Sequence, residues 1–457
     1  MNGRHPHVAQ DSSRPGRIDR FARSTARFAL PLGLVFALTT ACASRPTTPT
    51  PLEPDVVVPF DPTRPDAGLD SHDGLIDPAD LPPVPQTTCL PRQWPLWETY
   101  KIHFVEADGR VVDHFAKHST SEGQAYGMFL ALVARDREGF AKIFDWANRF
   151  LAKGDLGQHL PAWKWADKGG RQQIVDPNAA SDADLFMAYA LVHAASVFGS
   201  DEYARLGGRL LALIEAREVV DIPGLGPMML PAPIGFEIAQ GFRLNQSYLP
   251  LPLVRWASSM SKDRKDAPWT AMIEATVLMA EGSTPNRLYA DWIIWDKNSR
   301  RFVADTVLPP LGSYDAIRAY LWPAMMPVDD PMRGRLLARG SRLLELVRTT
   351  GFVPEKVHAW PNAAAGPADE VIPTPGPVGF EVVAQVFATA MGDLRLAASL
   401  GRSIAEKQRP NGLYGDPAFY YDHNLLLFAQ GFLEGRYAFR VDGGLVLPRE
   451  GDLCSTP

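Results

Sequence analysis

ASDADLFMAYALVHAASVF, residues 180–198, is the stretch of this chain that decides the fold. Two aspartates, Asp182 and Asp184, stand at its start, and the residues that follow are almost all apolar. A helix that is apolar on every face has to be buried. Ser181 or Asp182 is expected to cap it, because short polar side chains accept hydrogen bonds from the free N–H groups of a first turn. The stretch therefore predicts a helix inside a helical protein.

Helical periodicity continues on both sides of this stretch. Strand-like alternation is limited to residues 102–113, with a turn at 107–109, and to residues 287–296. About a dozen helices, roughly 30 residues apart and without a strict repeat, predict a closed toroid of helical hairpins and not an open solenoid. The other helical segments, separated by Gly/Pro-rich loops, are 123–152, 202–219, 267–282, 315–326, 332–351, 381–392 and 423–439. The expected fold class is all-α.

The N-terminal region resembles an export signal. Basic residues from Arg14 to Arg27 precede a short apolar stretch, Phe28–Leu38, which is too short to span a bilayer. Two readings stay open for residues 1–42: a lipoprotein signal with Cys42 lipidated, or an ordinary signal peptidase site at residues 41–43. Residues 43–88 are rich in Pro, Thr and Asp, which predicts a disordered linker. We expect residues 89–457 to form one folded domain.

Composition excludes several classes of function. The formal net charge of -6 leaves no basic footprint for nucleic acid. The ten histidines are scattered without the spacing of metal ligands, and no nucleophile elbow, phosphate loop or dinucleotide fingerprint is present. Residues 421–424, Tyr-Asp-His-Asn, are interpreted as a helix cap. Neither a metal nor a cofactor is expected.

Two of the three cysteines, Cys89 and Cys454, lie at the two ends of the predicted domain. An exported protein enters a compartment where disulfides persist. A toroid of hairpins also brings its first and last elements together. We therefore expect these two residues to form a disulfide.

Three helix starts carry a carboxylate beside small residues and aromatics: Glu122 in residues 119–128, Asp182, and Asp315 in residues 312–322. Each alone is explained by the helix dipole, and Asp315 with Arg318 by a surface ion pair. In a helical barrel, however, alternate helices share a direction, so their N-termini converge. Acids gathered there shift one another's pKa values, which keeps one protonated while another is ionised.

These segments resemble glycoside hydrolase family 8. Residues 180–198 match its signature, and TSEGQAYGM, LPAWKW, NQSYLP and GSYDAIRAYLW are similar to its other landmarks in the same order. The resemblance implies an (α/α)6 barrel and an inverting mechanism. It implies Glu122 as general acid, Asp315 as general base and Asp182 as a third acid that binds and distorts the sugar.

Within the family, the resemblance is to cellulases of the bacterial periplasm. It implies a β-1,4-glucan chain as substrate, the cellulose synthase complex as a partner, and membrane attachment only through an N-terminal lipid. Aromatic residues near the motifs are expected to form sugar platforms, and Asp184 to contact the substrate. A chitosanase, a xylanase or a non-catalytic glucan-binding surface lipoprotein stay open as alternatives. The expected platforms are Trp163, Trp165, Tyr126, Tyr248 and Tyr314.

Overall fold

The computed structural model describes residues 89–360 and 371–454. The predicted export signal, Cys42 and the predicted linker lie outside these ranges. Within them the chain forms thirteen α-helices. These are Pro95–Phe104 (α1), Ser121–Val133 (α2), Arg137–Trp146 (α3), Ser181–Phe198 (α4), Asp201–Arg217 (α5), Leu251–Met260 (α6), Trp269–Ser283 (α7), Ala316–Ala324 (α8), Arg333–Arg339 (α9), Arg342–Thr350 (α10), Val378–Ala390 (α11), Leu394–Glu406 (α12) and Tyr420–Leu433 (α13).

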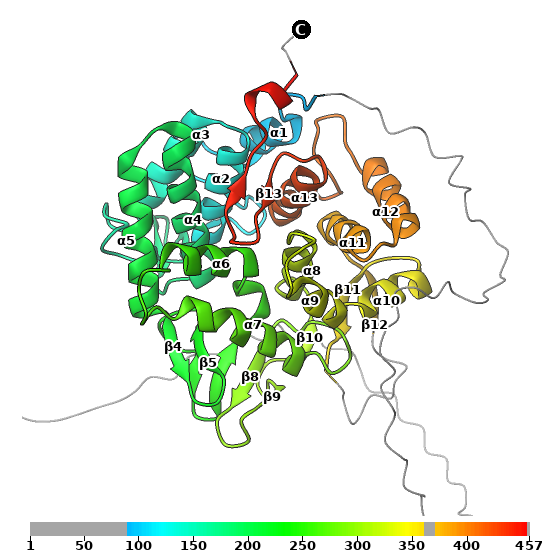
Figure 1. Ribbon diagram of the computed structural model, residues 1–457. Coiled ribbons are helices and arrows are strands. Elements are labelled where there is room, and N and C mark those ends of the chain that lie inside the picture. Colours follow the sequence, from blue (N-terminus) through cyan, green and yellow to red (C-terminus); the bar gives the residue numbers. More distant parts are fainter. Residues whose placement is uncertain (1–88, 361–370, 455–457) are drawn as a thin grey trace, which may run out of the picture. The chain divides into compact units, whose positions relative to one another are not determined.

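Six of these helices form a closed inner ring. Each of α2, α4, α6, α8, α11 and α13 contacts the next, and α13 returns to α2 (Figure 1). Outer helices α1, α3, α5, α7, α9 and α12 each pack against one inner helix. Inner helices such as α4 and α8 are buried on nearly every face, whereas outer helices such as α5 and α12 bury one face only. The architecture is an (α/α)6 barrel, so the predicted fold class is confirmed.

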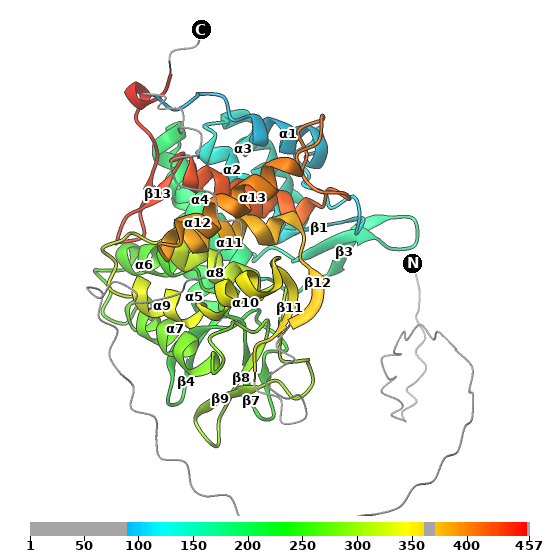
Figure 2. The ribbon, with the colours of Figure 1, turned by 90° about the vertical axis from the view of Figure 1, so that its right-hand side faces the viewer.

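Short antiparallel strands occupy the loops. β1 (His118–Thr120), β10 (Leu311–Gly312) and β12 (Val371–Pro375) come shortly before the inner helices α2, α8 and α11. Figure 2 shows β1, β3, β11 and β12 along one side of the barrel. The sheets are β1 with β2 (Lys164–Asp167) and β3 (Gln172–Asp176); β6 (Glu237–Ile238), β7 (Gly241–Leu244), β8 (Ile293–Asp296) and β9 (Arg301–Ala304); β10, β11 (Pro354–His358) and β12; β4 (Val219–Ile222) with β5 (Gly226–Met229); and β13 (Ala438–Phe439) with β14 (Leu445–Val446).

The predicted helices differ from the observed ones in several places, and the segment 332–351 forms two helices, α9 and α10. The segment 123–152 divides because Asp136 caps α3, accepting a 2.9 Å hydrogen bond from the N–H of Gly139. Helix α1 replaces the beginning of the predicted strand at 102–113, of which two isolated bridges are left, Val105 with Val111 and Asp113 with His118. Apolar residues alternate at Ile102 and Phe104 as they do in a strand. Over the whole of α1, however, the buried residues recur with the period of a helix. Helices α6 and α12 were not predicted.

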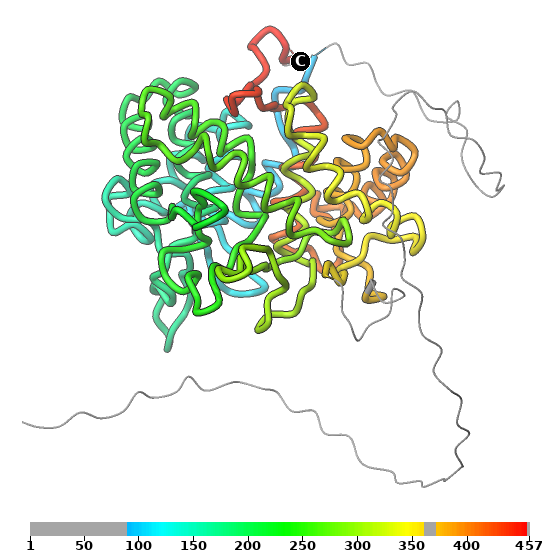
Figure 3. The backbone as a smooth tube through the Cα atoms, turned by 60° about the horizontal axis from the view of Figure 1, so that its bottom comes forward, coloured from blue at the N-terminus to red at the C-terminus, as the bar shows by residue number. Residues whose placement is uncertain are grey.

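The two ends of the described domain are joined side by side. Cys89 and Cys454 form the expected disulfide, with 4.9 Å between their Cα atoms. The N–H of Leu90 donates to Asp452 at 2.9 Å, and the N–H of Cys454 donates to Leu90 at 2.8 Å. Figure 3 shows the blue beginning of the domain next to its red end. Among the residues described, no helix has the length and apolar character that a membrane span needs.

Candidate active site

Side chains from three inner helices meet at the end of the barrel where these helices begin. Glu122 lies in the first turn of α2, which Thr120 caps by accepting a 3.1 Å hydrogen bond from Gly123. Asp182 lies in the first turn of α4, and Asp315 directly precedes α8. Helix N-termini favour negative charge. The shared direction of the inner helices thus gathers three acids, as the sequence predicted for a barrel.

A buried cation, Arg318, holds the three acids together. Its Nη1 donates to the Glu122 carboxylate and, at 3.3 Å, to Asp182 Oδ2; its Nη2 donates to Asp315 Oδ1 at 2.9 Å. Further bonds run to the Tyr126 hydroxyl at 3.0 Å and the Ser247 hydroxyl at 3.1 Å. Since Arg318 is only 2% exposed, its interpretation as half of a surface pair is wrong. A lone arginine in the apolar run AIRAYLW was the sequence signal for a buried ion pair.

The acids differ in their access to solvent. The side chains of Glu122 and Asp315 are 21% and 32% exposed, whereas that of Asp182 is buried. Burial raises the pKa of Asp182 to about 7, with Arg318 opposing the rise and Glu122 adding to it. Burial also raises the pKa of Asp315 to about 6. One guanidinium facing three carboxyl groups does not neutralise them all, so the cluster holds protons near neutral pH.

Asp291 positions Asp315 and was not singled out in the sequence. Its Oδ1 accepts hydrogen bonds of 2.8 Å from the N–H groups of Ser313 and Ala316, and its other oxygen accepts from the Ser313 hydroxyl. It therefore caps α8 from a distant loop and fixes the turn that carries Tyr314 and Asp315. Its negative charge also contributes to the raised pKa of Asp315.

Some predicted roles are not those that the structure shows. Helix α4 has no side-chain cap; its N-cap residue is Ala180, and Asp182 Oδ1 instead accepts from the adjacent N–H of Ala183. Asp184 is fully buried, and its carboxyl group interacts with Glu218, so it has no access to a substrate. Residues 421–424 lie inside the first turn of α13 and do not cap it.

The predicted aromatic platforms divide into exposed and packed rings. Tyr126 is buried between Phe186 and Phe428, at centroid distances of 5.2 and 4.9 Å, which excludes a platform; its hydroxyl supports Arg318. Trp165 packs edge-on against Trp146 at 5.7 Å, which favours a structural role.

Three other rings keep part of their surface free beside the acids. Tyr314 is 43% exposed, Trp163 is half-buried below Lys164, and Tyr248 lies 5.8 Å from the Arg318 guanidinium. Trp292, which the sequence reading missed, packs against Tyr248 at 6.2 Å and stacks on Phe236 at 5.7 Å.

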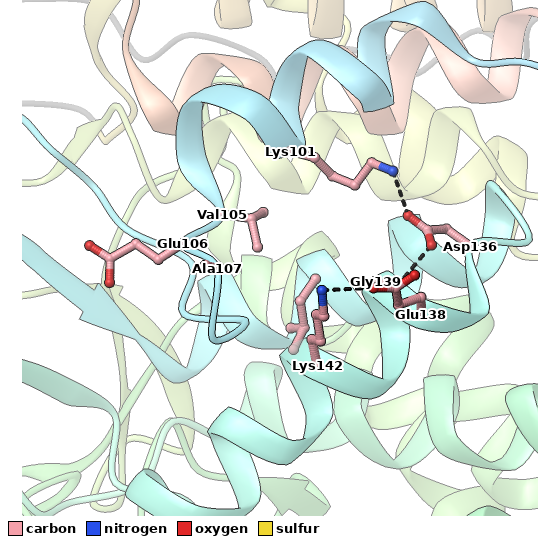
Figure 4. Close-up of a pocket in the computed structure, with 9 residues that line it drawn as sticks. Lys101, Val105, Glu106, Ala107, Asp136, Glu138, Gly139 and Lys142 are labelled. Carbon is pink, nitrogen blue, oxygen red and sulfur yellow. Dashed lines mark hydrogen bonds and ion pairs between the residues drawn. The ribbon is translucent and has the colours of Figure 1, made fainter.

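A separate pocket of about 290 Å³ lies between outer helices α1 and α3 (Figure 4). Its charged side chains pair with each other: Lys101 with Asp136 at 2.7 Å, and Lys142 with Glu138 at 2.8 Å. None of the three gathered acids lines it. Within residues 89–360 and 371–454, no group of His, Cys, Asp and Glu side chains has the arrangement of a metal site.

Two carboxyl groups that are open to solvent, Glu122 and Asp315, beside partly exposed aromatic rings are typical of enzymes that hydrolyse glycosidic bonds. Comparisons with known proteins support the same class of enzyme. Residues 86–403 match the model of glycosyl hydrolases family 8, and the chain belongs to that family.

Similar proteins span most of the chain. It is 38% identical to an endoglucanase of Salmonella typhi over 365 residues, which cover 79% of this chain and 92% of that protein. It is also 38% identical to an endoglucanase of Pseudomonas fluorescens (strain SBW25), over 79% of this chain and 93% of that protein. The solved structure of an endo-1,4-D-glucanase from Vibrio fischeri ES114 has a TM-score of 0.66 at 31% identity, covering 78% of this chain and 99% of that one.

Proposed function

We propose that this protein is an endo-acting hydrolase of β-1,4-glucosidic bonds in cellulose-type glucans and that it works with inversion. The observation that carries the proposal is the sharing of one buried guanidinium by Glu122 and Asp315, each bound to a different terminal nitrogen. The two carboxyl groups are thereby held apart and both remain open to solvent. Similarity to endoglucanases over most of the chain supports a glucan as substrate.

In the proposed reaction Glu122 is the general acid and Asp315 the general base. Asp315 removes a proton from a water molecule, whose oxygen attacks the anomeric carbon from the face opposite the leaving group. Glu122 gives its proton to the glycosidic oxygen as the carbon–oxygen bond breaks. The products are a chain with a new α-anomeric reducing end and a chain with a new 4-hydroxyl. We assign Asp182, which Arg318 holds, the third role that the family resemblance implies, a hydrogen bond to the distorted sugar.

Isosteric amides test the two roles. Glu122→Gln and Asp315→Asn each remove a titratable oxygen and should lower kcat by about 10²–10⁴-fold, because each role needs proton transfer. Reducing-sugar release measures the loss, and circular dichroism checks the fold. Glu138→Gln and Asp145→Asn, at exposed positions on α3, are matched controls and should keep full activity. Retention of more than about a tenth of the activity by either site variant contradicts its assigned role.

The anomer of the first product tests inversion separately. We expect the α-anomer, seen by NMR at an early time point before mutarotation. A β-anomer would require a covalent intermediate, and Asp315 would then not be a base.

A substrate panel decides between glucans and the alternatives. Carboxymethyl-cellulose and lichenan should be hydrolysed faster than chitosan or xylan. Faster hydrolysis of chitosan or xylan would reassign the substrate, and no hydrolysis of any would favour a binding protein.

We also propose that the protein is exported and serves cellulose synthesis in the periplasm. The basic and apolar residues before Leu38 and the Cys89–Cys454 disulfide support export. Lipidation of Cys42 is part of the same proposal, and mass spectrometry of the mature N-terminus tests it. Co-purification with the cellulose synthase complex tests the partnership.

A further inference from the structure

A second pocket, of about 360 Å³, adjoins the candidate active site. It lies where α11 and α13 begin, the same end of the barrel at which the acids gather. Neither the three acids nor Arg318 line it, but Tyr314, the neighbour of Asp315, does. Tyr314 therefore connects the acid cluster with this pocket. Its size falls in the range of small-ligand sites.

Two aromatic rings lie at the edge of the pocket: Phe419 lines it, and Phe115 packs against Phe419 from outside the lining. Phe419, directly before α13, lines it and meets Phe115 edge-to-face at a centroid distance of 5.1 Å. Phe115 is 72% exposed, an unusual state for so large an apolar ring. The turn that carries Phe115 is held in place, because Asp113 Oδ1 accepts 2.9 Å hydrogen bonds from the N–H groups of Phe115 and Ala116. The ring is thus presented to solvent by a defined loop.

The rest of the pocket suits a neutral, hydroxyl-rich ligand. Pro377 and Pro417 contribute apolar surface, while Glu355 and Asp422 contribute polar groups. Glu355 accepts a 3.2 Å hydrogen bond from the Tyr314 hydroxyl. Burial raises the pKa of Asp422 to about 7, and a carboxyl group in its protonated form can both donate and accept hydrogen bonds. Apolar rings beside mixed donors and acceptors are the chemistry of sugar recognition.

We propose that this pocket binds a glucosyl unit of the substrate chain at a distance from the cleaved bond, with Phe115 and Phe419 as its platform. The proposal rests on the proposed function in taking a β-1,4-glucan as ligand. It makes Phe115 and Phe419 binding residues with no part in proton transfer. They should therefore determine how strongly long chains bind and leave the bond-breaking step unchanged.

Binding is measured by calorimetry with cellohexaose and cellotriose, in a Glu122→Gln background so that the sugars stay intact. Phe115→Ala should weaken cellohexaose binding by about three- to tenfold, the effect of one aromatic contact. Its effect on cellotriose should be small, and Phe115→Trp should restore binding. Ile102→Ala, 77% exposed on outer helix α1, is the matched control and should bind as the parent does.

The two proposals fail in different ways. Equal binding of cellohexaose by Phe115→Ala and the parent, or no binding by the parent, overturns the pocket proposal. If the parent binds cellohexaose and Phe115→Ala binds it more weakly, the pocket proposal is supported. If the wild-type protein then hydrolyses no substrate, the proposed reaction is overturned. Since Phe115 is exposed, its replacement leaves the core intact; Phe419→Ala, at a half-buried position, should give a loss in the same direction.

Discussion

Asp291 shows how one residue outside the acid cluster controls a residue within it. It holds the backbone of the turn before α8 by hydrogen bonds and raises the pKa of Asp315 by its charge. An amide keeps the accepting oxygen and removes the charge. The two contributions can therefore be separated by two substitutions at one position.

Asp291→Asn should move the acid limb of the activity profile to lower pH. A base must be ionised to act, so kcat/KM rises as the pH passes the pKa of Asp315, about 6 in the parent. Without the charge of Asp291 that pKa falls and activity begins at a more acidic pH. Asp291→Ala should lower kcat by up to about 100-fold at every pH, because the turn loses its support. An unchanged acid limb in Asp291→Asn means that Asp291 acts only through structure.

The sequence predicted the site residues that a pattern of neighbouring residues marks. It missed those whose role depends on contacts between distant parts of the chain. Glu122, Asp182 and Asp315 stand at helix starts, where a pattern along the chain is enough to find them. Asp291 acts across 22 residues of sequence on Ser313, and nothing near it in the chain shows that contact. Asp184 shares its motif with Asp182, yet the turn of α4 directs it into the interior.

At the scale of elements, two buried carboxyl groups lie close together where the start of α4 meets the end of α5. Asp184 and Glu218 are both fully buried and interact with each other. Burial raises the pKa of both. Two carboxylates cannot both be ionised in such a place, so the pair holds a proton under conditions where exposed acids have none.

This pair should make the protein less stable as the pH rises. The folded-state pKa values lie above those of the unfolded chain, about 3.9 and 4.3. The stabilisation is therefore complete below about pH 4 and is lost as the pH rises towards the folded-state values. Glu218→Gln, which resembles the protonated acid, should reduce the loss of melting temperature between pH 5 and pH 8. Glu218→Ala should lower the melting temperature at both. A steeper loss in Glu218→Gln than in the parent argues against a shared proton.

The sequence predicted which segments are helices better than it predicted where each helix begins and ends. The apolar inner helices α4 and α8 were predicted because burial on all faces leaves a continuous apolar run. Helix α12 was missed although its buried residues recur at helical spacing on one face. Helix α1 was assigned partly to a strand, because two alternating residues cannot distinguish the two periods.

At the scale of the whole molecule, the disulfide joins positions 365 residues apart. A cross-link over such a loop reduces the conformational entropy of the unfolded chain by an amount worth about 5–6 kcal/mol in the chain-entropy model. Cys89→Ser with Cys454→Ser should therefore lower the melting temperature, while kcat stays unchanged because the acids lie on inner helices. Calorimetry of oxidised and reduced wild-type protein gives the same comparison without mutation. Equal melting temperatures would show that the non-covalent contacts at this junction are enough to secure the ends.

The joining of the two ends also has a mechanical consequence. A tensile force applied to the chain ahead of Cys89 reaches a covalent bond before it reaches α1. The bond passes the load to Cys454, and the Arg92–Glu450 ion pair at 2.5 Å stands beside that junction. Helix α1 is thus protected from being pulled away from α13, and the barrel bears the force as a single unit. If the proposed lipid anchor at Cys42 transmits a pull, the disulfide and not the contacts of helix α1 carries that load first.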